Sequence, residues 1–340
     1  MRAQENANPR FGATRARLLL GRLSTASWNQ YQTAMASFCE FCATWQPPIQ
    51  LDQVTARHLV DYVCYLAERP KRLAAVTVAS YLAGIRTVLR ECGLDMGTDT
   101  NLAAVLAGYK RWTRSTGEHT VKRAAWLARY TQRAIDRATT LMHTSTQRKL
   151  TAKEHQWIVS AAMIAMAMIT FSRGDTICKL LLNEVRATIN PINIRLSKQK
   201  RPKDYIPDQD HQHGNSTKFL LRYLGYLRAS EYRDASFLFG NTPASPKAQT
   251  LDSAVKLVAE TLHIPSPTSK HWTGHCVRIG AISEAFAIGV PLARIAFFAG
   301  HRHTSTTEGY VRHDVTASPS AHLFFGHLVP LSVTAGPAPL

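Results

Sequence analysis

Six residues in the second half of the chain have side-chain types suited to attack on a phosphodiester bond. In chain order they are Arg173, Lys198, His275, Arg278, His301 and Tyr310. A tyrosine hydroxyl is a nucleophile that leaves a covalent ester, and two arginines offer planar, permanently charged forks to the non-bridging oxygens. A histidine and a lysine can manage the protons of the attacking and leaving oxygens. This set predicts strand cleavage that needs no metal and no other cofactor, because side chains supply the positive charge.

Each residue has an expected role. Tyr310 is the predicted nucleophile, His275 its base, Lys198 the acid for the leaving oxygen, and His301 a further donor to the phosphate. His275 and Arg278 are three positions apart on a predicted helix, so they project to one side. Tyr310 follows a Thr-Ser-Thr-Thr run at 304–307. Such residues favour helix starts, so we expect Tyr310 on a short helix that can move.

The order and spacing of these residues resemble the tyrosine recombinase (phage-integrase-type) family. The shared pattern is an Arg, a hairpin Lys, His-x-x-Arg, Gly-His and then Tyr, with gaps here of 23 from Arg278 to His301 and 9 from His301 to Tyr310. The resemblance covers most of the chain. It implies a helical core-binding domain and a catalytic domain that clamp double-stranded DNA, with four protomers acting on two sites. The run at 273–281 looks most like the branch found in DIRS-type retroelements.

Two positions within this pattern leave alternatives open. Lys198 directly follows an alternating run and so has a fixed direction, but Lys200 is a close rival for the general acid. The family usually has an acidic residue three places after the first arginine, where this chain has Thr176. Asp175 is adjacent but one position out of helical phase, so the residue that braces Arg173 stays open.

The cysteine and histidine spacings are weak evidence for a metal or redox site. Cys39-x-x-Cys42 has no second cysteine pair at zinc-ribbon spacing, and Cys42 falls on a core stripe, which favours helix packing. A zinc set would leave the Tyr and Arg spacings unexplained; its members would be His271, His275, His301 and His303.

Composition narrows the class of protein. Lys and Arg total 41 against 23 Asp and Glu in 340 residues, which gives a formal charge of +18 and favours a nucleic-acid partner. The longest apolar stretch, 157–171, is shorter than the ~20 residues that cross a bilayer, so we expect a buried helix and no membrane partner. No signal peptide is visible, and six cysteines are too few for a disulfide scaffold. We therefore expect an intracellular protein located with DNA, in the nucleus if the host is eukaryotic.

The periodicity predicts the elements that position these residues. Residues 24–109, after a basic tail at 1–23, show four amphipathic stripes typical of a helical bundle. Residues 121–314 mix helices near 153–171, 217–228, 251–262, 274–287 and 291–298 with a hairpin, in which 192–196 alternates and 205–206 follows a polar turn. The expected fold class is mainly α with a small antiparallel β-sheet, an α+β arrangement.

A basic linker is expected at 110–120, followed by a helix from near Val121. Residues 110–149 hold ten basic and two acidic side chains, and such one-signed density favours phosphate contact over an ordinary solvated face. The candidate DNA-binding residues are Lys110, Arg111, Arg114, Lys122, Arg123, Arg129, Arg133, Arg137, Lys200 and Arg201. The tail at 315–340 carries an apolar patch at 323–325, which needs a surface on another protomer or, equally well, on its own domain.

Three functions fit these features. The favoured one is a site-specific recombinase or integrase that cleaves and rejoins DNA through a 3′-phosphotyrosyl intermediate, without ATP. A type IB topoisomerase-like relaxase would use the same chemistry as a monomer. A recombinase-derived DNA-binding protein would use only the basic surface, and the complete residue set disfavours it.

Overall fold

The computed structural model describes residues 24–70, 72–94, 100–115, 123–187, 192–196, 203–205, 215–229, 238–242, 245–248, 250–267 and 271–329. The chain divides into two compact units, residues 1–121 and 122–340. Each unit has its own hydrophobic core, built from residues of that unit alone. They are called below the N-terminal unit and, after its expected role, the catalytic unit.

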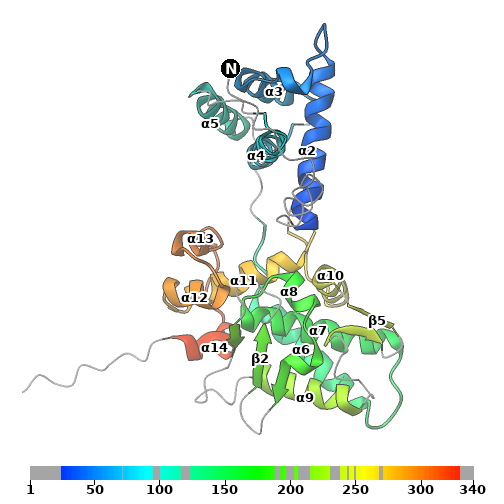
Figure 1. Ribbon diagram of the computed structural model, residues 1–340. Coiled ribbons are helices and arrows are strands. Elements are labelled where there is room, and N and C mark those ends of the chain that lie inside the picture. Colours follow the sequence, from blue (N-terminus) through cyan, green and yellow to red (C-terminus); the bar gives the residue numbers. More distant parts are fainter. Residues whose placement is uncertain are drawn as a thin grey trace, which may run out of the picture. The chain divides into compact units, whose positions relative to one another are not determined.

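The N-terminal unit is a bundle of four helices. They are α2 (Thr25–Ala43), α3 (Ala56–Glu68), α4 (Ala75–Glu91) and α5 (Thr100–Ser115), with a short 3-10 turn at Leu51–Gln53 (Figure 1). Its core is aromatic: the Tyr62 ring meets Phe38 edge-on at 5.2 Å, and the Tyr62 hydroxyl donates to Ser37. Helices α2 and α4 lie close together, since a Cβ at Gly84 would stand 2.8 Å from the Tyr31 ring.

The boundary between the units differs from the predicted linker. Helix α5 continues to Ser115, so residues 110–115 are helical, and the expected linker at 110–120 is wrong over that part. The basic helix, α6 (Ala128–Thr144), begins later than the predicted start near Val121. The basic stretch at 110–149 thus includes the end of α5 and the whole of α6. This reflects the good helix propensity of Lys and Arg, which lets a charged face continue a helix.

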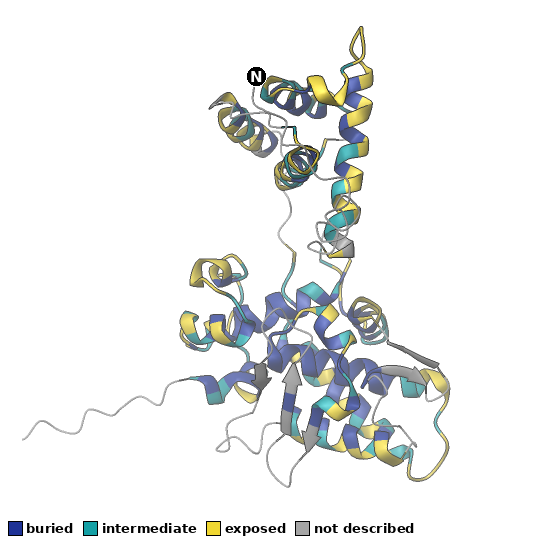
Figure 2. Cartoon of the chain, in the orientation of Figure 1, coloured by how far each residue is buried: buried dark blue, intermediate teal, exposed yellow. Residues whose placement is uncertain are grey.

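The catalytic unit is built around one buried helix. Every residue of α7 (Ala152–Thr170) from Trp157 onward is buried, and α7 appears dark blue over most of its length in Figure 2. A capping box joins Thr151 and Glu154 at its start. Helices α6, α9 (Asn215–Ala229), α10 (Leu251–Thr261) and α11 (Gly274–Ala287) pack around it. A helix that is apolar on all sides needs such neighbours on every side, which explains its position.

The predicted single small sheet needs correction. The described strands form two separate antiparallel pieces: a three-stranded one of β1 (Val185–Ala187), β2 (Ile192–Leu196) and β3 (Lys203–Tyr205), and a two-stranded one of β4 (Gly240–Thr242) and β5 (Ser245–Ala248). None of these strands exceeds five residues. The α+β expectation therefore overstates the β content, and the chain is a helical protein with short β elements at its margin. The predicted hairpin is present, since β2 coincides with the alternating run at 192–196 and pairs with β3. The other strands have only three or four residues, which is too short for alternation to reveal them.

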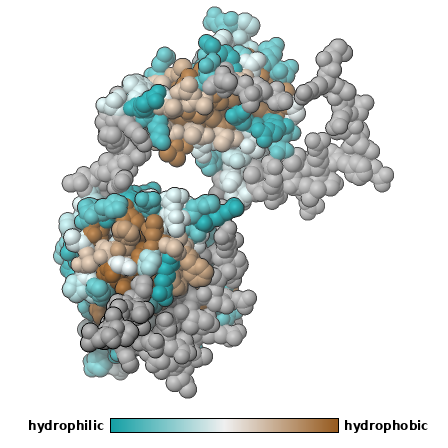
Figure 3. Space-filling model, turned by 90° about the vertical axis from the view of Figure 1, so that its left-hand side faces the viewer, coloured by the Kyte–Doolittle hydropathy of each residue, from teal (hydrophilic) through white to brown (hydrophobic). Residues whose placement is uncertain are grey.

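The last helices are short. They are α12 (Leu292–Ala299), α13 (Thr304–Glu308) and α14 (Pro319–Phe325), followed by a 3-10 turn at Gly326–Leu328. Phe324 and Phe325 of α14 are buried in the catalytic unit's own core, so for these two residues the structure agrees with the alternative of docking on their own domain. Large apolar side chains remain exposed on α12 and α14: Phe297 is 71% exposed and Leu323 is 45% exposed. Figure 3 shows a brown, hydrophobic area on the face of the catalytic unit seen there.

Candidate active site

Arg278 is a buried cation held by the ends of two helices. Its side chain on α11 is 1% exposed, and it donates to the carbonyls of Phe171 and Ala299, the latter at 2.7 Å. Phe171 and Ala299 lie at the C-terminal ends of α7 and α12. The last carbonyl groups of a helix have no N–H partner within that helix. A cation is favourable there because those carbonyls form the negative ends of the helix dipoles. The Nε of Arg278 is buried and has no hydrogen-bond partner among the described residues, so not every N–H of this cation is used within the protein.

His301 is fixed by partners on both ring nitrogens. Its Nε2 lies 2.6 Å from Nη2 of Arg278, and its Nδ1 lies 2.8 Å from the Thr307 hydroxyl. Because the guanidinium only donates, Nε2 accepts and Nδ1 carries the proton. The ring therefore orients Arg278 in this state, and its expected role as a donor to phosphate stays a prediction. Gly300, at φ 67°, ends α12 and turns the chain toward His301.

The ring of Tyr310 lies among these groups. Its centroid is 5.4 Å from the His275 ring and 5.1 Å from the His301 ring, and the Arg278 guanidinium stands 5.4 Å from the same centroid. The structure thus brings together four predicted catalytic residues from three separate segments of the chain. We expected Tyr310 on a short helix. It lies instead two residues beyond the end of α13.

Arg173 lies at the start of α8 (Gly174–Cys178), with an exposed side chain. Its charge lowers the pKa of both Arg278 and His275, which places it near them. Within the described residues no ion pair forms with Arg173, and Thr176, which stands where an acidic residue was expected, is buried. Asp175 is exposed, and the residue that braces Arg173 stays open.

Burial and positive charge set the protonation of the site. Burial, followed by the charges of Arg123, Arg278, Arg173 and Arg312, lowers the pKa of His275, so its ring is neutral near pH 7 and can accept a proton. Burial, followed by the charge of Arg173, lowers the pKa of Arg278 to about 10, and this side chain stays charged at neutral pH. The site therefore has a free base beside a permanent cation.

Several predicted residues lie outside the described residues. They are Lys198, the rival Lys200, and the candidate DNA contacts Arg201 and Lys122. Arg114 lies on α5, with its side chain outside the description. Lys110, Arg111 and Arg123 are exposed, as a phosphate contact requires.

The row of arginines on α6 is engaged within the protein. Arg133 donates to the carbonyl of Leu262 at the end of α10, Arg137 lies over the Trp157 ring at 4.9 Å, and Arg129 lies over Tyr130 at 5.2 Å. These side chains remain exposed, so their predicted phosphate contacts stay predictions. Their spacing is equally well explained by intramolecular contacts, which the sequence pattern could not distinguish.

Residues without an assigned role also shape the site. Thr307 is fully buried and holds His301, and Ser283 of α11 contacts the main chain at Tyr310 and Arg312. The sequence showed Arg312 only as part of the run Tyr310-Val311-Arg312. Its partners are main-chain carbonyls, which leave no sequence signal.

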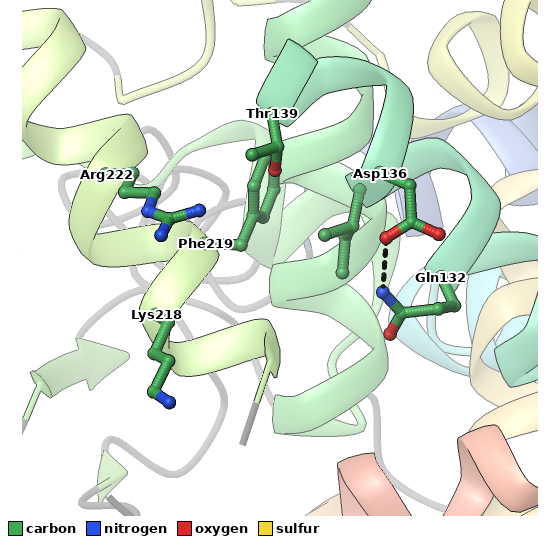
Figure 4. Close-up of a pocket in the computed structure, with 7 residues that line it drawn as sticks. Gln132, Asp136, Thr139, Lys218, Phe219 and Arg222 are labelled. Atoms are coloured by element: carbon green, nitrogen blue, oxygen red, sulfur yellow. Dashed lines mark hydrogen bonds between the residues drawn. The ribbon is translucent and has the colours of Figure 1, made fainter. Parts of the chain in front are cut away.

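A separate cavity of about 410 Å³ lies between α6 and α9. Figure 4 shows Lys218, Phe219 and Arg222 of α9 facing Thr139 and the hydrogen-bonded pair Gln132 and Asp136 of α6. None of the predicted catalytic residues that the structure describes lines it. The described residues also hold no group of three His, Cys, Asp or Glu arranged to bind a metal, so the zinc set is not assembled there.

The fold and the grouping of these side chains are those expected of a tyrosine recombinase. The chain belongs to the phage integrase family, which matches residues 135–316, and the phage integrase SAM-like domain matches residues 14–93. No curated protein sequence matches it significantly. No helix among the described residues has the length and apolar character to cross a membrane.

Solved structures share the fold at low sequence identity. A lambda integrase tetramer bound to a Holliday junction has a TM-score of 0.56 at 10% identity, over 89% of this chain and 76% of that chain. XerH recombinase in a post-cleavage complex with its palindromic difH substrate has a TM-score of 0.55 at 15% identity, over 83% of this chain and 75% of that chain. The Tn1549 transposon integrase in complex with transposon right-end DNA has a TM-score of 0.54 at 12% identity, over 88% of this chain and 94% of that chain.

Proposed function

We propose that this chain is a site-specific recombinase that cleaves and rejoins DNA strands through a 3′-phosphotyrosyl intermediate on Tyr310. The observation that carries the proposal is the packing of Arg278, His275 and His301 around the Tyr310 ring. A structural tyrosine would not need a buried cation with an unused N–H beside two imidazoles. The membership of the phage integrase family supports the same chemistry.

Cleavage is a direct displacement at phosphorus. The Tyr310 oxygen forms a bond to phosphorus while the bond to the 5′ oxygen breaks, and the tyrosine proton passes to neutral His275. Arg278 and Arg173 neutralise the charge that develops on the non-bridging oxygens. Lys198, or its neighbour Lys200, gives a proton to the leaving oxygen. The products are a 3′-phosphotyrosine and a 5′-hydroxyl, and the reverse reaction with another 5′-hydroxyl rejoins a strand.

This chemistry needs no external energy source. The phosphotyrosine ester keeps the energy of the broken phosphodiester, so ligation follows without ATP. The partner is double-stranded DNA, and the family resemblance supports a homotetramer on two sites with a Holliday-junction intermediate. The same resemblance, in the run at 273–281, supports a place in the DIRS-type retroelement branch and hence a nuclear location.

A suicide substrate tests the proposal. A nicked duplex whose 5′ fragment diffuses away after cleavage traps the covalent adduct, which a denaturing gel resolves. We expect wild-type protein to form the adduct, and Tyr310→Phe to form none while binding DNA with nearly unchanged affinity, because phosphate contacts supply most of the affinity. An adduct that persists in Tyr310→Phe would contradict the assignment.

The alternatives make different products. A topoisomerase-like relaxase would relax supercoiled plasmid as a monomer without exchanging strands, whereas a recombinase yields junctions and recombinant duplexes from a tetramer. A non-catalytic DNA-binding protein would give no adduct on any substrate. Sequencing the DNA attached to Tyr310 would report the target site and the polarity of cleavage together.

A further inference from the structure

The main chain around Tyr310 is held by the side chain of Arg312. Its Nη1 donates to the carbonyls of Gly309, Tyr310 and Val311, each at 3.2 Å. Two N–H bonds thus serve three acceptors, so at least one N–H is shared. The backbone N–H of Arg312 donates to the Ser283 hydroxyl at 3.0 Å, which fixes the same turn to α11.

The other end of the guanidinium reaches the first residues of the catalytic unit. Nε of Arg312 donates to the carbonyl of Arg123 at 3.2 Å. Arg123 begins the crossing segment, residues 123–128, which lies over α11. Trp126 N donates to the Cys276 carbonyl at 2.9 Å, and Ala128 N donates to the buried carboxylate of Glu284. A Cβ at Gly280 would lie 1.7 Å from the Trp126 carbonyl oxygen, so the contact is backbone against backbone.

The crossing segment is therefore a rigid reference for the active site. It is anchored at three points to the helix that carries His275 and Arg278. Through the Arg123 carbonyl, Arg312 joins the Tyr310 turn to this reference. Tyr310 otherwise follows a five-residue helix, α13, which is too short to fix the position of a residue beyond its end.

We propose that Arg312 is a positioning residue, which sets the place of Tyr310 relative to His275 and Arg278 by joining the nucleophile's turn to the crossing segment. This role rests on the proposed function of Tyr310. It differs from phosphate binding, because the bonds from Nε and Nη1 go to carbonyl oxygens of the protein. A lysine could satisfy the carbonyls at 309–311, but it could not reach the Arg123 carbonyl at the same time.

The test compares Arg312→Met, Arg312→Lys and the control Arg228→Met, which removes an exposed arginine of α9. Single-turnover adduct formation on the suicide substrate is measured at saturating DNA, with the dissociation constant and the melting temperature beside it. We expect Arg312→Met to slow the adduct step by about 10- to 100-fold, since a displacement of about 1 Å costs that much. Arg312→Lys should fall between this variant and wild type, and DNA affinity should change little in all three.

Two further readouts separate positioning from other roles. Hydrogen exchange of the free protein should speed up at the amides of residues 309–313 in Arg312→Met, with the core of α7 still protected. Because Arg312 also lowers the pKa of His275, the rates are repeated at pH 8.5, where His275 is neutral in every variant. The rate loss should persist there if position is what Arg312 provides.

Several results would overturn the inference. They are an adduct rate equal to wild type, a loss confined to DNA affinity, a loss that disappears at pH 8.5, or unchanged exchange at 309–313. If Arg312→Met does not fold, Arg312→Lys carries the same comparison. If wild-type protein forms no adduct, the proposed function fails and the positioning role with it, whereas an adduct with unaffected variants overturns Arg312 alone.

Discussion

The two units bury polar side chains in different ways. In the described part of the N-terminal unit the buried polar side chains are uncharged, namely Ser37 and Thr113, and Ser37 pairs with the Tyr62 hydroxyl. The catalytic unit buries two charges on one helix, Arg278 and Glu284 of α11. Buried charges are costly unless they are bonded, so both side chains need partners inside the catalytic unit.

Each buried charge stands at helix ends of the opposite sign. Arg278 collects the C-terminal carbonyls of α7 and α12, and Glu284 accepts from Ala128 N at the start of α6 and from the Ser318 hydroxyl, the N-cap of α14, at 2.9 Å. Cations are favourable at the C-termini of helices and anions at their N-termini. Helix α11 thus connects four helices through two side chains, whereas the described helices of the N-terminal unit pack through apolar and uncharged side chains.

Gly280→Ala should give the largest effect, a loss of stability of the catalytic unit. The new Cβ would meet the Trp126 main chain, which cannot move without releasing the crossing segment, so we expect a loss of about 3 kcal/mol or more. Gly84→Ala meets only the ring of Tyr31 and should cost the N-terminal unit less. Gly225→Ala on α9, with open space around it, should be neutral or stabilising.

Denaturant unfolding followed by circular dichroism checks this order. The transition of the catalytic unit should shift in Gly280→Ala, and the transition of the N-terminal unit should not. A Gly280→Ala protein as stable as Gly225→Ala would contradict the described crossing.

Arg278→Lys should give the second-largest effect, a slower formation of the covalent adduct. An ammonium cannot hold the Phe171 and Ala299 carbonyls and His301 together, so the adduct step should slow by about 100- to 1000-fold. The matched control is Arg69→Lys in the N-terminal unit, where Arg69 bonds Glu40 and Tyr65 at the surface. Adduct rates within a few-fold of each other for the two variants would remove the contrast between the units.

The sequence predicted the elements that rest on periodicity. The buried helix, expected at 153–171, is Ala152–Thr170, and the helix of His275 and Arg278 is found where it was expected. The meeting of Tyr310 with these residues was implied by the resemblance to the tyrosine recombinases, which their order and spacing carry. Periodic burial and fixed gaps are local properties, so a single sequence contains them.

The partners of these residues could not be predicted. Arg278 bonds the carbonyls of Phe171 and Ala299, which are 107 and 21 positions away, and every residue type has a carbonyl. Arg129, Arg133 and Arg137 were placed on one face correctly, but spacing cannot tell a phosphate from Trp157 or the Leu262 carbonyl. The tail at 315–340 posed the same problem, since an apolar patch does not indicate whose core it enters.

Glu284→Gln should produce a smaller, pH-dependent change. Burial raises the pKa of Glu284, against the opposing hydrogen bonds from Ala128 and Ser318. The stability from its protonated form is therefore fully present below the unfolded value of about 4.3 and is lost as the pH rises through the folded pKa. The glutamine mimics the protonated acid and does not titrate. Its stability relative to wild type should increase from pH 4 to pH 8, as thermal melts can measure, and a pH-independent difference would contradict this.

Arg123→Ala should have the smallest effect, and it tests which charge controls His275. Arg123 is the first among the cations that lower the pKa of His275, after burial. Cleavage needs the neutral ring, so the adduct rate falls as the pH drops through this pKa. Removing the charge raises the pKa, and the acid limb of the pH–rate profile should shift to higher pH. At pH 6 the variant should be a few-fold slower than wild type, and at pH 8 the two should agree, because the Arg123 carbonyl that holds Arg312 remains. The control Arg228→Ala should leave the profile in place. The profile is measured at saturating DNA and compared with an NMR titration of His275. A limb that stays in place or moves to lower pH would show that the charge of Arg123 does not lower the pKa of His275.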